Sequence, residues 1–293
     1  MSFMATLAHW VEGARPRTLP NAIAPVLVGA GAAQSAGSFS WGASLLALLV
    51  AVCMVIGVNY ANDYSDGVRG TDDDRTGPIR MVGSKTVSPW AVRNAAVGFL
   101  ALGGVSGLLL VIITGRWLML VVGAICIAAA WFYTGGKRPY GYEGFGEVAV
   151  FLFFGPVAVL GTLYVQAGSV NGSAIGAACG VGCFSAAVLV SNNLRDIPND
   201  TIYEKNTLAV LLGDRDTRHL WVALVVIPFL MTLLLGFAHP IALIGFLAVP
   251  LVIPPAKRII RGEQGRELIP VLRDTGLAML AWSAATGIGL ALS

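Results

Sequence analysis

Two short stretches of the chain carry asparagine and aspartate at spacings that suit a binding site. Residues 59–66 and residues 192–200 each close a long apolar run. If a helix continues through each stretch, spacings of i, i+3, i+4, i+7 and i, i+4, i+8 place the polar side chains on one helix face. These side chains are Asn59, Asn62, Asp63 and Asp66 in the first stretch, and Asn192, Asn193, Asp196 and Asp200 in the second. We expect the rest of the chain to bring the two stripes together.

The residue types indicate the chemistry. Four carboxylates that converge without a counter-ion would repel one another, so the stripes are expected to hold cations. The candidate ligands are Asp and Asn oxygens, with no His or Cys in either stretch, which favours Mg2+ or Ca2+ over Zn2+. Mg2+ in particular combines one or two carboxylates with phosphate oxygens. Basic residues near the stripes are expected if a polyanion such as diphosphate binds there; they are Arg69, Arg75, Arg80, Lys137, Arg138, Arg195 and Lys205.

Composition indicates which elements must position the stripes. The chain has 293 residues, of which 56% are hydrophobic and 12% are charged, and its mean hydropathy is +0.75. About 25% of the residues of a soluble globular protein are charged. The chain is therefore expected to be a membrane protein, with residues 1–293 forming a single transmembrane domain. Many of its 36 glycines lie in apolar runs, which favours close helix packing within one bundle over a dimer contact.

Gaps between charged residues predict the number of membrane crossings. Asp, Glu, Lys and Arg are absent from 18–62, 94–115, 117–136, 148–194, 219–256 and 275–293. A spanning helix needs about 20 apolar residues, so each of the three long gaps holds two helices and each short gap holds one. Turn residues near the centres of the long gaps, at 35–38, 168–173 and 236–240, support this division. We expect an all-α, polytopic membrane bundle of nine transmembrane helices.

The basic residues predict the orientation of the bundle. Nine spans place all of the 19 Lys and Arg residues except Arg116 on one face, which is therefore cytoplasmic. The N-terminus is then cytoplasmic and the C-terminus lies outside. All 16 acidic residues share the cytoplasmic face, so we expect a multi-pass protein of the cytoplasmic (plasma) membrane whose active site faces the cytoplasm.

An internal repeat is consistent with this topology. Aligning Asn62 with Asn192 also aligns Asp66 with Asp196, and each alignment point ends an even-numbered helix, the second or the sixth. The bundle is therefore interpreted as two four-helix repeats plus a ninth helix. Repeat-built membrane proteins commonly place their site at the interface between repeats.

These motifs resemble those of the UbiA-type intramembrane aromatic prenyltransferases. That family has nine helices and two aspartate-rich motifs, N-D-x-x-D-x-x-x-D and D-x-x-x-D, after the second and sixth helices. This chain has Asn62-Asp63-Tyr64-Ser65-Asp66 and Asp196-Ile197-Pro198-Asn199-Asp200. It departs from the first motif because Gly70 stands four residues after Asp66, and the next acids are Asp72, Asp73 and Asp74.

Loop motifs are similar to one branch of that family, the 1,4-dihydroxy-2-naphthoate polyprenyltransferases of menaquinone synthesis. They lie at 14–20, 75–80, 192–200 and 205–213. The resemblance implies Mg2+-dependent transfer of a polyprenyl group from polyprenyl diphosphate to 1,4-dihydroxy-2-naphthoate. Loss of CO2 and diphosphate then leads to demethylmenaquinone. Membrane lipid is the expected surrounding, with no nucleic acid and no obligatory protein partner.

The same resemblance implies roles for individual residues. Asn62, Asp63, Asp66, Asp196 and Asp200 would hold Mg2+ against the diphosphate, and the four aspartates would be the catalytic groups. Asn59, Asn192, Asn193 and Arg69 would complete the substrate-binding stripe, with Lys137, Arg138 and Lys205 contacting diphosphate. Arg75 or Arg80 would meet the naphthoate carboxylate, while Tyr60, Tyr64 and Tyr133 either shield the allylic cation or anchor the helices at the interface.

Three alternatives stay open at this point. A membrane transporter would also place acids in a helical bundle, although nearer mid-membrane and on broken helices. A CDP-alcohol phosphotransferase shares the fragment Asp63-x-x-Asp66-Gly67 but keeps its acids within one stretch, whereas this chain has a second set 130 residues later. The nearest alternative is a UbiA-type enzyme with another aromatic acceptor, such as 4-hydroxybenzoate.

Overall fold

The computed structural model describes residues 6–71 and 80–293, and the secondary structure within these ranges is helical, with no strand. The first elements are α1 (Leu7–Ala14), η1 (Pro16–Thr18), α2 (Pro20–Ser35), α3 (Trp41–Arg69), α4 (Pro89–Thr114), α5 (Leu118–Phe132) and η2 (Tyr140–Tyr142). They are followed by α6 (Gly146–Leu152), the π-helical segment η3 (Phe153–Leu160), α7 (Gly161–Ala167) and α8 (Gly172–Ile202). The last elements are α9 (Leu208–Gly236), η4 (Pro240–Ala248), α10 (Val249–Ile260), η5 (Gly265–Leu268) and α11 (Ile269–Ala291).

Six helical segments are long and apolar enough to cross a membrane. They are α3, α4, the continuous segment Gly146–Ala167, α8, α9 and the segment Pro240–Ile260. The chain is therefore an all-helical, multi-pass membrane protein over the residues described. The predicted turns at 35–38, 168–173 and 236–240 lie where one helix ends and the next begins. The short helix α1, which precedes the first apolar run, was not predicted.

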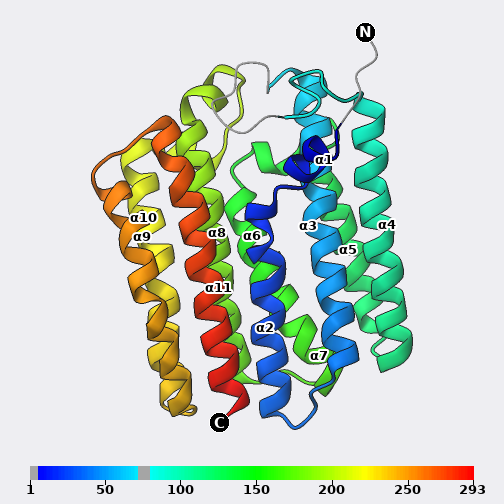
Figure 1. The fold of residues 1–293 in the computed structure, drawn as a ribbon, viewed down its shortest axis with the longest axis vertical. Helices are drawn as coiled ribbons and strands as arrows, with labels where there is room; N and C mark the ends of the chain where they lie inside the picture. The colour runs from blue at the N-terminus through cyan, green and yellow to red at the C-terminus, as the bar shows by residue number, and fades with distance from the viewer. Residues whose placement is uncertain (1–5, 72–79) are drawn as a thin grey trace.

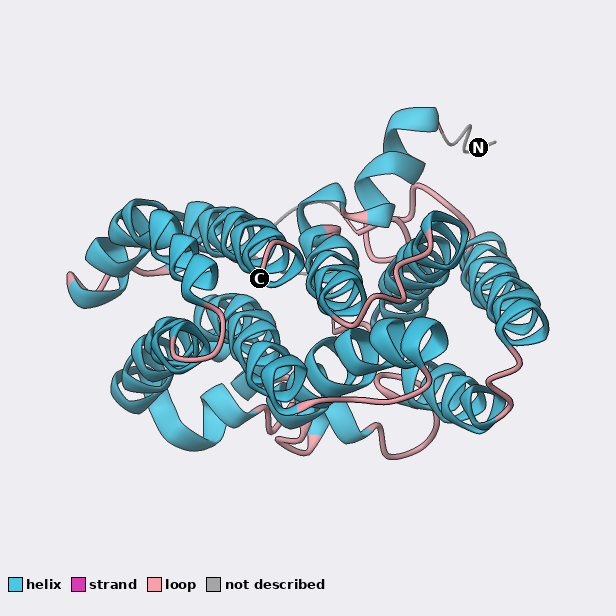
Figure 2. Ribbon diagram, turned by 90° about the horizontal axis from the view of Figure 1, so that it is seen from below, coloured by secondary structure: helices cyan, strands magenta, loops and turns pink. Residues whose placement is uncertain are grey.

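The two polar stripes lie on helices, as predicted. α3 continues without interruption through Asp66 to Arg69, and α8 continues through Asp200 to Ile202. Both helices end at the end of the bundle that carries α1, whereas the C-terminus lies at the opposite end (Figure 1). Figure 2 looks along the bundle and shows most of the helices nearly end-on.

The C-terminal half of the bundle has a continuous core. α8, α9 and α11 meet around the buried rings of Phe184, Trp221 and Trp282. Trp282 Nε1 donates a hydrogen bond to Thr232 Oγ1 at 2.8 Å, and Trp221 Nε1 donates to the Ser191 hydroxyl at 2.9 Å. Both indole N–H groups therefore have hydrogen-bond partners. The buried rings pack against one another, and this half of the bundle forms a close-packed wall.

Glycines let two pairs of helices touch through their backbones. A Cβ placed on Gly31 of α2 would lie 2.1 Å from the carbonyl oxygen of Gly287 in α11. A Cβ on Gly155 in η3 would lie 2.8 Å from the Cα of Gly182 in α8. Only hydrogen fits in these contacts, so these glycines serve helix packing within one chain, as the sequence predicts.

Replacing Gly31 with alanine is expected to destabilise the bundle. The added methyl meets backbone rather than a flexible side chain, so α2 and α11 must move apart at a cost of about 1–3 kcal/mol. Thermal unfolding of the purified protein in detergent measures the effect. The matched control is Gly98→Ala in α4, where nothing lies within 4 Å of the added Cβ. That change is expected to leave the unfolding temperature unchanged or to raise it, because alanine has the higher helix propensity. Equal unfolding temperatures for the two variants would contradict the contact.

Candidate active site

The polar ends of α3 and α8 are linked through the residues that follow each helix. Lys205, three residues beyond α8, places its Nζ 3.4 Å from Oδ1 of Asp66 in α3. Asn199 of α8 donates from Nδ2 to the backbone carbonyl of Thr71, just beyond α3, at 3.2 Å. The two stripes, 130 residues apart in the sequence, lie at the same end of the bundle (Figure 1). Asn59, Asn62 and Asp63 of the first stripe and Asn192 of the second line one cavity, whereas Asp66, Asp196 and Asp200 are not among its lining residues.

Asp66 is the centre of this contact. Its side chain is 5% exposed, and besides Lys205 it has Arg80 Nη2 at 3.9 Å and the phenol of Tyr142 as a hydrogen-bond donor. The Tyr142 ring also lies between two cations, with Lys205 Nζ 4.5 Å and Arg69 Cζ 5.4 Å from its centroid. Burial raises the pKa of the Tyr142 phenol and the adjacent Asp66 carboxylate raises it further. Tyr142 therefore keeps its proton at neutral pH and donates a hydrogen bond to Asp66.

Asp63 has different partners although it shares the stripe with Asp66. Its two carboxylate oxygens accept hydrogen bonds from the backbone N–H groups of Met81 and Val82, both at 3.0 Å. The side chain is 1% exposed, and Val82 packs on Gly67 so closely that a Cβ there would lie 2.4 Å from it. Asp63 thus fastens the segment after Arg80 onto the end of α3.

The second stripe is held together mainly by Arg195. Its guanidinium donates to both carboxylate oxygens of Asp196, at 2.7 and 2.8 Å, and to Oδ1 of Asn192 at 2.7 Å. Asp200 accepts from the Thr207 hydroxyl at 3.5 Å, while its backbone carbonyl accepts from the N–H of Lys205 at 2.8 Å. These bonds bend the chain after α8 back over the site and so place Lys205 beside Asp66.

Asparagines of both stripes link neighbouring segments to the site. Asn59 donates from Nδ2 to the carbonyl of Ala14 and to the Thr18 hydroxyl, both at 2.9 Å. Asn62 accepts a hydrogen bond from the Thr134 hydroxyl at 2.8 Å. These amides hold the N-terminal segment and the end of α5 against α3.

Asn193 reveals an acidic residue that was absent from the predicted site. It donates from Nδ2 to Oε1 of Glu147 at 2.9 Å. Glu147 is buried in the first turn of α6. The contact joins α8 to the start of the segment that carries η3.

Several predicted substrate-binding residues form no hydrogen bond or ion pair with these carboxylates among the described residues. Lys137 and Arg138 are exposed in the loop after α5. Arg69 donates to the backbone carbonyls of Thr134 and Gly136 in that loop. Arg75, like the acidic residues Asp72, Asp73 and Asp74, lies outside the described residues.

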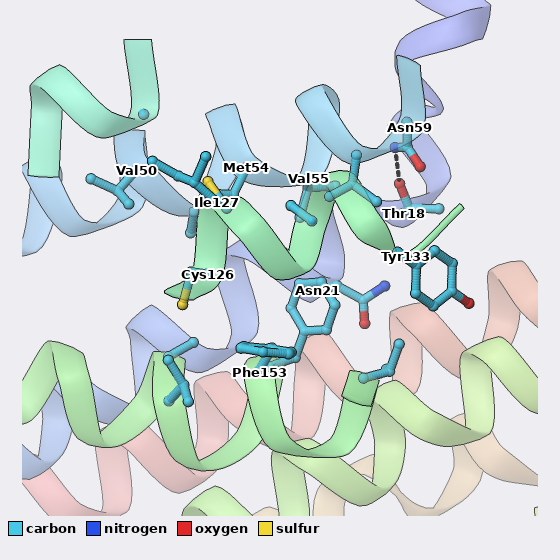
Figure 3. A pocket seen from close by; sticks show the side chains of 18 of the residues that line it. Thr18, Asn21, Val50, Met54, Val55, Asn59, Cys126, Ile127, Tyr133 and Phe153 are labelled. Atoms are coloured by element: carbon cyan, nitrogen blue, oxygen red, sulfur yellow. Dashed lines mark hydrogen bonds between the residues drawn. The ribbon is translucent and has the colours of Figure 1, made fainter. Parts of the chain in front are cut away.

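A cavity of about 550 Å³ extends from the stripes into the bundle. Its polar end is lined by Arg15, Arg17, Asn59, Asn62, Asp63, Arg80, Tyr133, Asn192 and Arg195. Its other end is apolar and is formed by α3, α4, α5 and η3, through residues such as Met54, Ile127 and Phe153 (Figure 3). The site therefore joins a charged compartment to a hydrocarbon-like one.

The apolar end of the cavity reaches the outer surface of the bundle. Leu108 in α4 and Leu120 in α5 line it although they are 44% and 38% exposed, and the exposed Ala124 lines it as well. Glycines keep the wall thin, with Gly103, Gly104 and Gly107 in α4 and Gly123 in α5.

Comparison with known proteins assigns the chain to a family. The model of the UbiA prenyltransferase family matches residues 22–288. The chain belongs to the UbiA prenyltransferase family. Its most similar relatives include the 1,4-dihydroxy-2-naphthoate octaprenyltransferase of Mycobacterium tuberculosis, which is 57% identical over 98% of both chains. The enzyme of the same name from Escherichia coli is 36% identical over 97% of this chain and 95% of the relative.

Solved structures of UbiA homologues share the fold. The homologue from Archaeoglobus fulgidus bound to GPP and Mg2+ superposes with a TM-score of 0.68 and 15% identity, over 95% of this chain and 99% of that chain. The apo homologue from Aeropyrum pernix K1 gives a TM-score of 0.69 and 17% identity over 99% of both chains.

The oxygen donors of this UbiA family member fit a hard divalent cation. Within residues 6–71 and 80–293, no three His, Cys, Asp or Glu side chains already form a metal-binding group. The stripe carboxylates instead hold Lys205, Arg195 and backbone N–H groups. The stripes nevertheless consist of carboxylate and amide oxygens, the ligands that Mg2+ prefers.

Several site residues were not predicted from the sequence. Arg15 and Arg17 line the cavity because η1 runs beside α3. They belong to the Arg-Pro-Arg motif before the first apolar run. This motif could have marked both arginines as candidate site residues. Tyr142 is one of two tyrosines around a glycine, which gives no local sign of a contact with Asp66. Tyr133 lines the cavity as a predicted aromatic wall, whereas the buried Tyr60 donates to the Trp10 carbonyl at 2.7 Å.

Replacing Asp63 with alanine is expected to lower the stability of the protein as well as to damage the site. The change leaves the N–H groups of Met81 and Val82 buried without an acceptor, at a cost of about 1–3 kcal/mol for each group. Thermal unfolding in detergent without substrates measures this cost. Asp216→Ala is the control, because that side chain is 64% exposed, and it should leave the unfolding temperature nearly unchanged. An Asp63→Ala protein as stable as the wild type would show that Asp63 does not hold the segment after Arg80.

Proposed function

We propose that this chain transfers a polyprenyl group from polyprenyl diphosphate to 1,4-dihydroxy-2-naphthoate, with release of diphosphate and CO2. The carrying observation is the cavity. Its polar end is lined by Asn59, Asn62 and Asp63 of the first stripe, Asn192 of the second and several arginines, and its apolar end reaches exposed residues of α4 and α5. That shape suits a donor with a diphosphate head and an isoprenoid tail. The acceptor is inferred from relatives that are named 1,4-dihydroxy-2-naphthoate octaprenyltransferases. They are up to 57% identical to this chain over nearly its whole length.

Mg2+ is the proposed cofactor. Asn62, Asp63, Asp66, Asp196 and Asp200 would hold it, which is supported by their oxygen chemistry and by the complex of an Archaeoglobus fulgidus homologue with GPP and Mg2+. Bound there, the ion would stabilise negative charge on the departing diphosphate.

Basic side chains supply the remaining charge at the leaving group. Lys205 and Arg80 both face Asp66 and lie beside the site, where they can donate to diphosphate oxygens as the allylic C–O bond breaks. The electron pair of that bond leaves with the diphosphate, and Tyr133 in the cavity wall presents its ring to the allylic cation. Asn59, Asn192, Asn193 and Arg69 hold this arrangement through the hydrogen bonds described above.

The acceptor reacts at the ring carbon that bears its carboxylate. A pair of ring electrons forms the new C–C bond to the allylic carbon, the C–CO2 bond then breaks, and its electrons return to the ring. The product is the reduced form of demethylmenaquinone. Arg15 and Arg17 line the polar end of the cavity and are proposed to bind the carboxylate. Arg80, one of the two arginines expected there from the sequence, is assigned to the diphosphate instead, and Arg75 lies outside the described residues.

The proposed topology has nine crossings, in two four-helix repeats plus a ninth helix, within a single domain. Besides the six long apolar segments, α2, α5 and α11 would cross. An odd number of crossings is supported by α1 and the C-terminus, which lie at opposite ends of the bundle (Figure 1). The basic residues in the loops beside the stripes support a site on the cytoplasmic face of the plasma membrane.

Acceptor competition tests the proposed reaction. Purified protein in lipid is given a polyprenyl diphosphate with 1,4-dihydroxy-2-naphthoate or with 4-hydroxybenzoate, and prenylated product and CO2 are measured. We expect Mg2+-dependent product and CO2 with the naphthoate alone. Chelation of Mg2+ and the variants Asp66→Ala and Asp196→Ala should each lower turnover by at least about 100-fold, as expected for loss of charge stabilisation. Product from 4-hydroxybenzoate alone would overturn the acceptor, and transport of a substrate across the bilayer without product would favour a transporter.

Filling the apolar end of the cavity is expected to select shorter donors. Gly123 lines the cavity and nothing lies within 4 Å of a Cβ built on it, so Gly123→Phe is proposed to place a ring in the path of a tail that leaves between α4 and α5. Turnover of long polyprenyl diphosphates should fall by about 10-fold or more while geranyl diphosphate is used at a near-normal rate, a difference of about 1.4 kcal/mol. Gly98→Phe, on the open face of α4 outside the cavity lining, is the control and should affect neither donor. Equal losses for both donors would contradict this path for the tail.

A further inference from the structure

Asn21 is a buried polar residue of the cavity, and its side-chain oxygen has no hydrogen-bond partner in the part of the chain that the structure describes. It lies in the first turn of α2 and is 8% exposed. Its Oδ1 atom is buried and has no hydrogen-bond partner among the described residues. The side chain does not cap its own helix either, because the start of α2 has no side-chain cap. A buried amide without partners costs free energy, so its presence requires a reason.

The position of Asn21 supplies that reason. Its amide projects into the cavity between Val55 of α3 and Phe153 of η3, on the side toward Tyr133 (Figure 3). Two polar side chains at this end of the cavity pair with each other, because Asn59 donates to the Thr18 hydroxyl at 2.9 Å. The amide of Asn21 therefore stands where the polar end of the cavity gives way to the apolar end.

The proposed acceptor has a group in need of such a partner. Of its two hydroxyls, the one beside the carboxylate can donate to that carboxylate within the molecule. The hydroxyl at position 4 lies across the ring and has no internal partner, so in a closed cavity it requires one from the protein. An amide is suitable, because a turn of the side chain exchanges its oxygen and nitrogen without changing its shape.

Arg17 lines the same cavity as Asn21 and belongs to the arginines proposed to bind the carboxylate. In the naphthoate the 4-hydroxyl is meta to the carboxylate, whereas in 4-hydroxybenzoate the hydroxyl is directly opposite the carboxylate. A side chain that hydrogen-bonds the hydroxyl while the arginines hold the carboxylate therefore distinguishes the two acceptors by the direction of the hydroxyl.

We propose that Asn21 is a specificity-determining residue that hydrogen-bonds the 4-hydroxyl of the naphthoate acceptor. This inference rests on the proposed function, since it concerns the acceptor of that reaction. The contact orients the ring and does not take part in bond breaking. A site that pairs with a substrate hydroxyl rejects analogues that lack it, because its own polar group is then left unpaired.

The test replaces Asn21 with leucine, which has nearly the same shape and suits the apolar neighbours Val55 and Phe153. Steady-state kinetics in lipid should show kcat/KM for 1,4-dihydroxy-2-naphthoate reduced by about 10- to 100-fold, the usual range for a lost buried hydrogen bond. The KM for the polyprenyl diphosphate should not change. Gln34→Leu, at the exposed far end of the same helix, is the control and should alter neither constant.

An analogue without the 4-hydroxyl separates a direct contact from a structural effect. 1-Hydroxy-2-naphthoate is measured as a competitive inhibitor against the dihydroxy acceptor in both proteins. If Asn21 pairs with the 4-hydroxyl, the inhibition constant of this analogue should be at least as tight for Asn21→Leu as for the wild type. A parallel loss of affinity for the analogue and the acceptor, or an unchanged kcat/KM for the acceptor, would overturn the proposal. Failure of the wild type to prenylate the naphthoate at all would instead overturn the proposed function.

Discussion

Carboxylates at the end of an apolar bundle are costly unless each has a partner, and this constraint organises the site. Asp63 is satisfied by backbone N–H groups, Asp66 by Lys205 and Tyr142, and Asp196 by Arg195. The partners of Asp63 and Asp66 come from three segments of the chain. Asp63 is bound by the segment after Arg80, and Asp66 by Tyr142 and by Lys205. Compensating these buried charges therefore also folds the loops after α3, α5 and α8 over the site.

The apolar end of the cavity depends on departures from regular helix packing. Pro156 cannot donate a backbone hydrogen bond, and the segment η3 around it adopts the wider π-helical form. Residues of η3, including Phe153, then face the cavity opposite α5. The close-packed half around Trp282 provides a firm wall on the other side. The cavity lies mainly among α3, α4, α5 and η3, while the C-terminal half of the bundle stays closely packed and supports it.

Sequence reasoning located the helices and the stripes because both follow from local periodicity. Charge-free intervals marked where apolar helices lie, and i, i+3, i+4 spacing placed the polar residues on one face of α3 and of α8. The other residues of the site were harder to predict from the sequence. Tyr142 and Arg17 lie in short elements between the long helices, and helical periodicity does not predict where such connecting segments run. Spacing also could not separate Asp63, which binds backbone N–H groups, from Asp66, which binds cations. Lys137 follows α5 closely in sequence yet is exposed, because position in the chain does not determine the direction of a loop.

Asp66 and a diphosphate would compete for the same cations. In the chain as it stands, Lys205 and Arg80 compensate Asp66 in a nearly water-free setting. A diphosphate that took these cations for itself would leave a buried carboxylate without compensation, which costs several kcal/mol. Positive charge must therefore enter together with the diphosphate if both anions are to stay in the site. This charge balance is an argument for joint binding of Mg2+ and the donor that does not depend on any relative, since it follows from the burial of Asp66 and from the two side chains that face it.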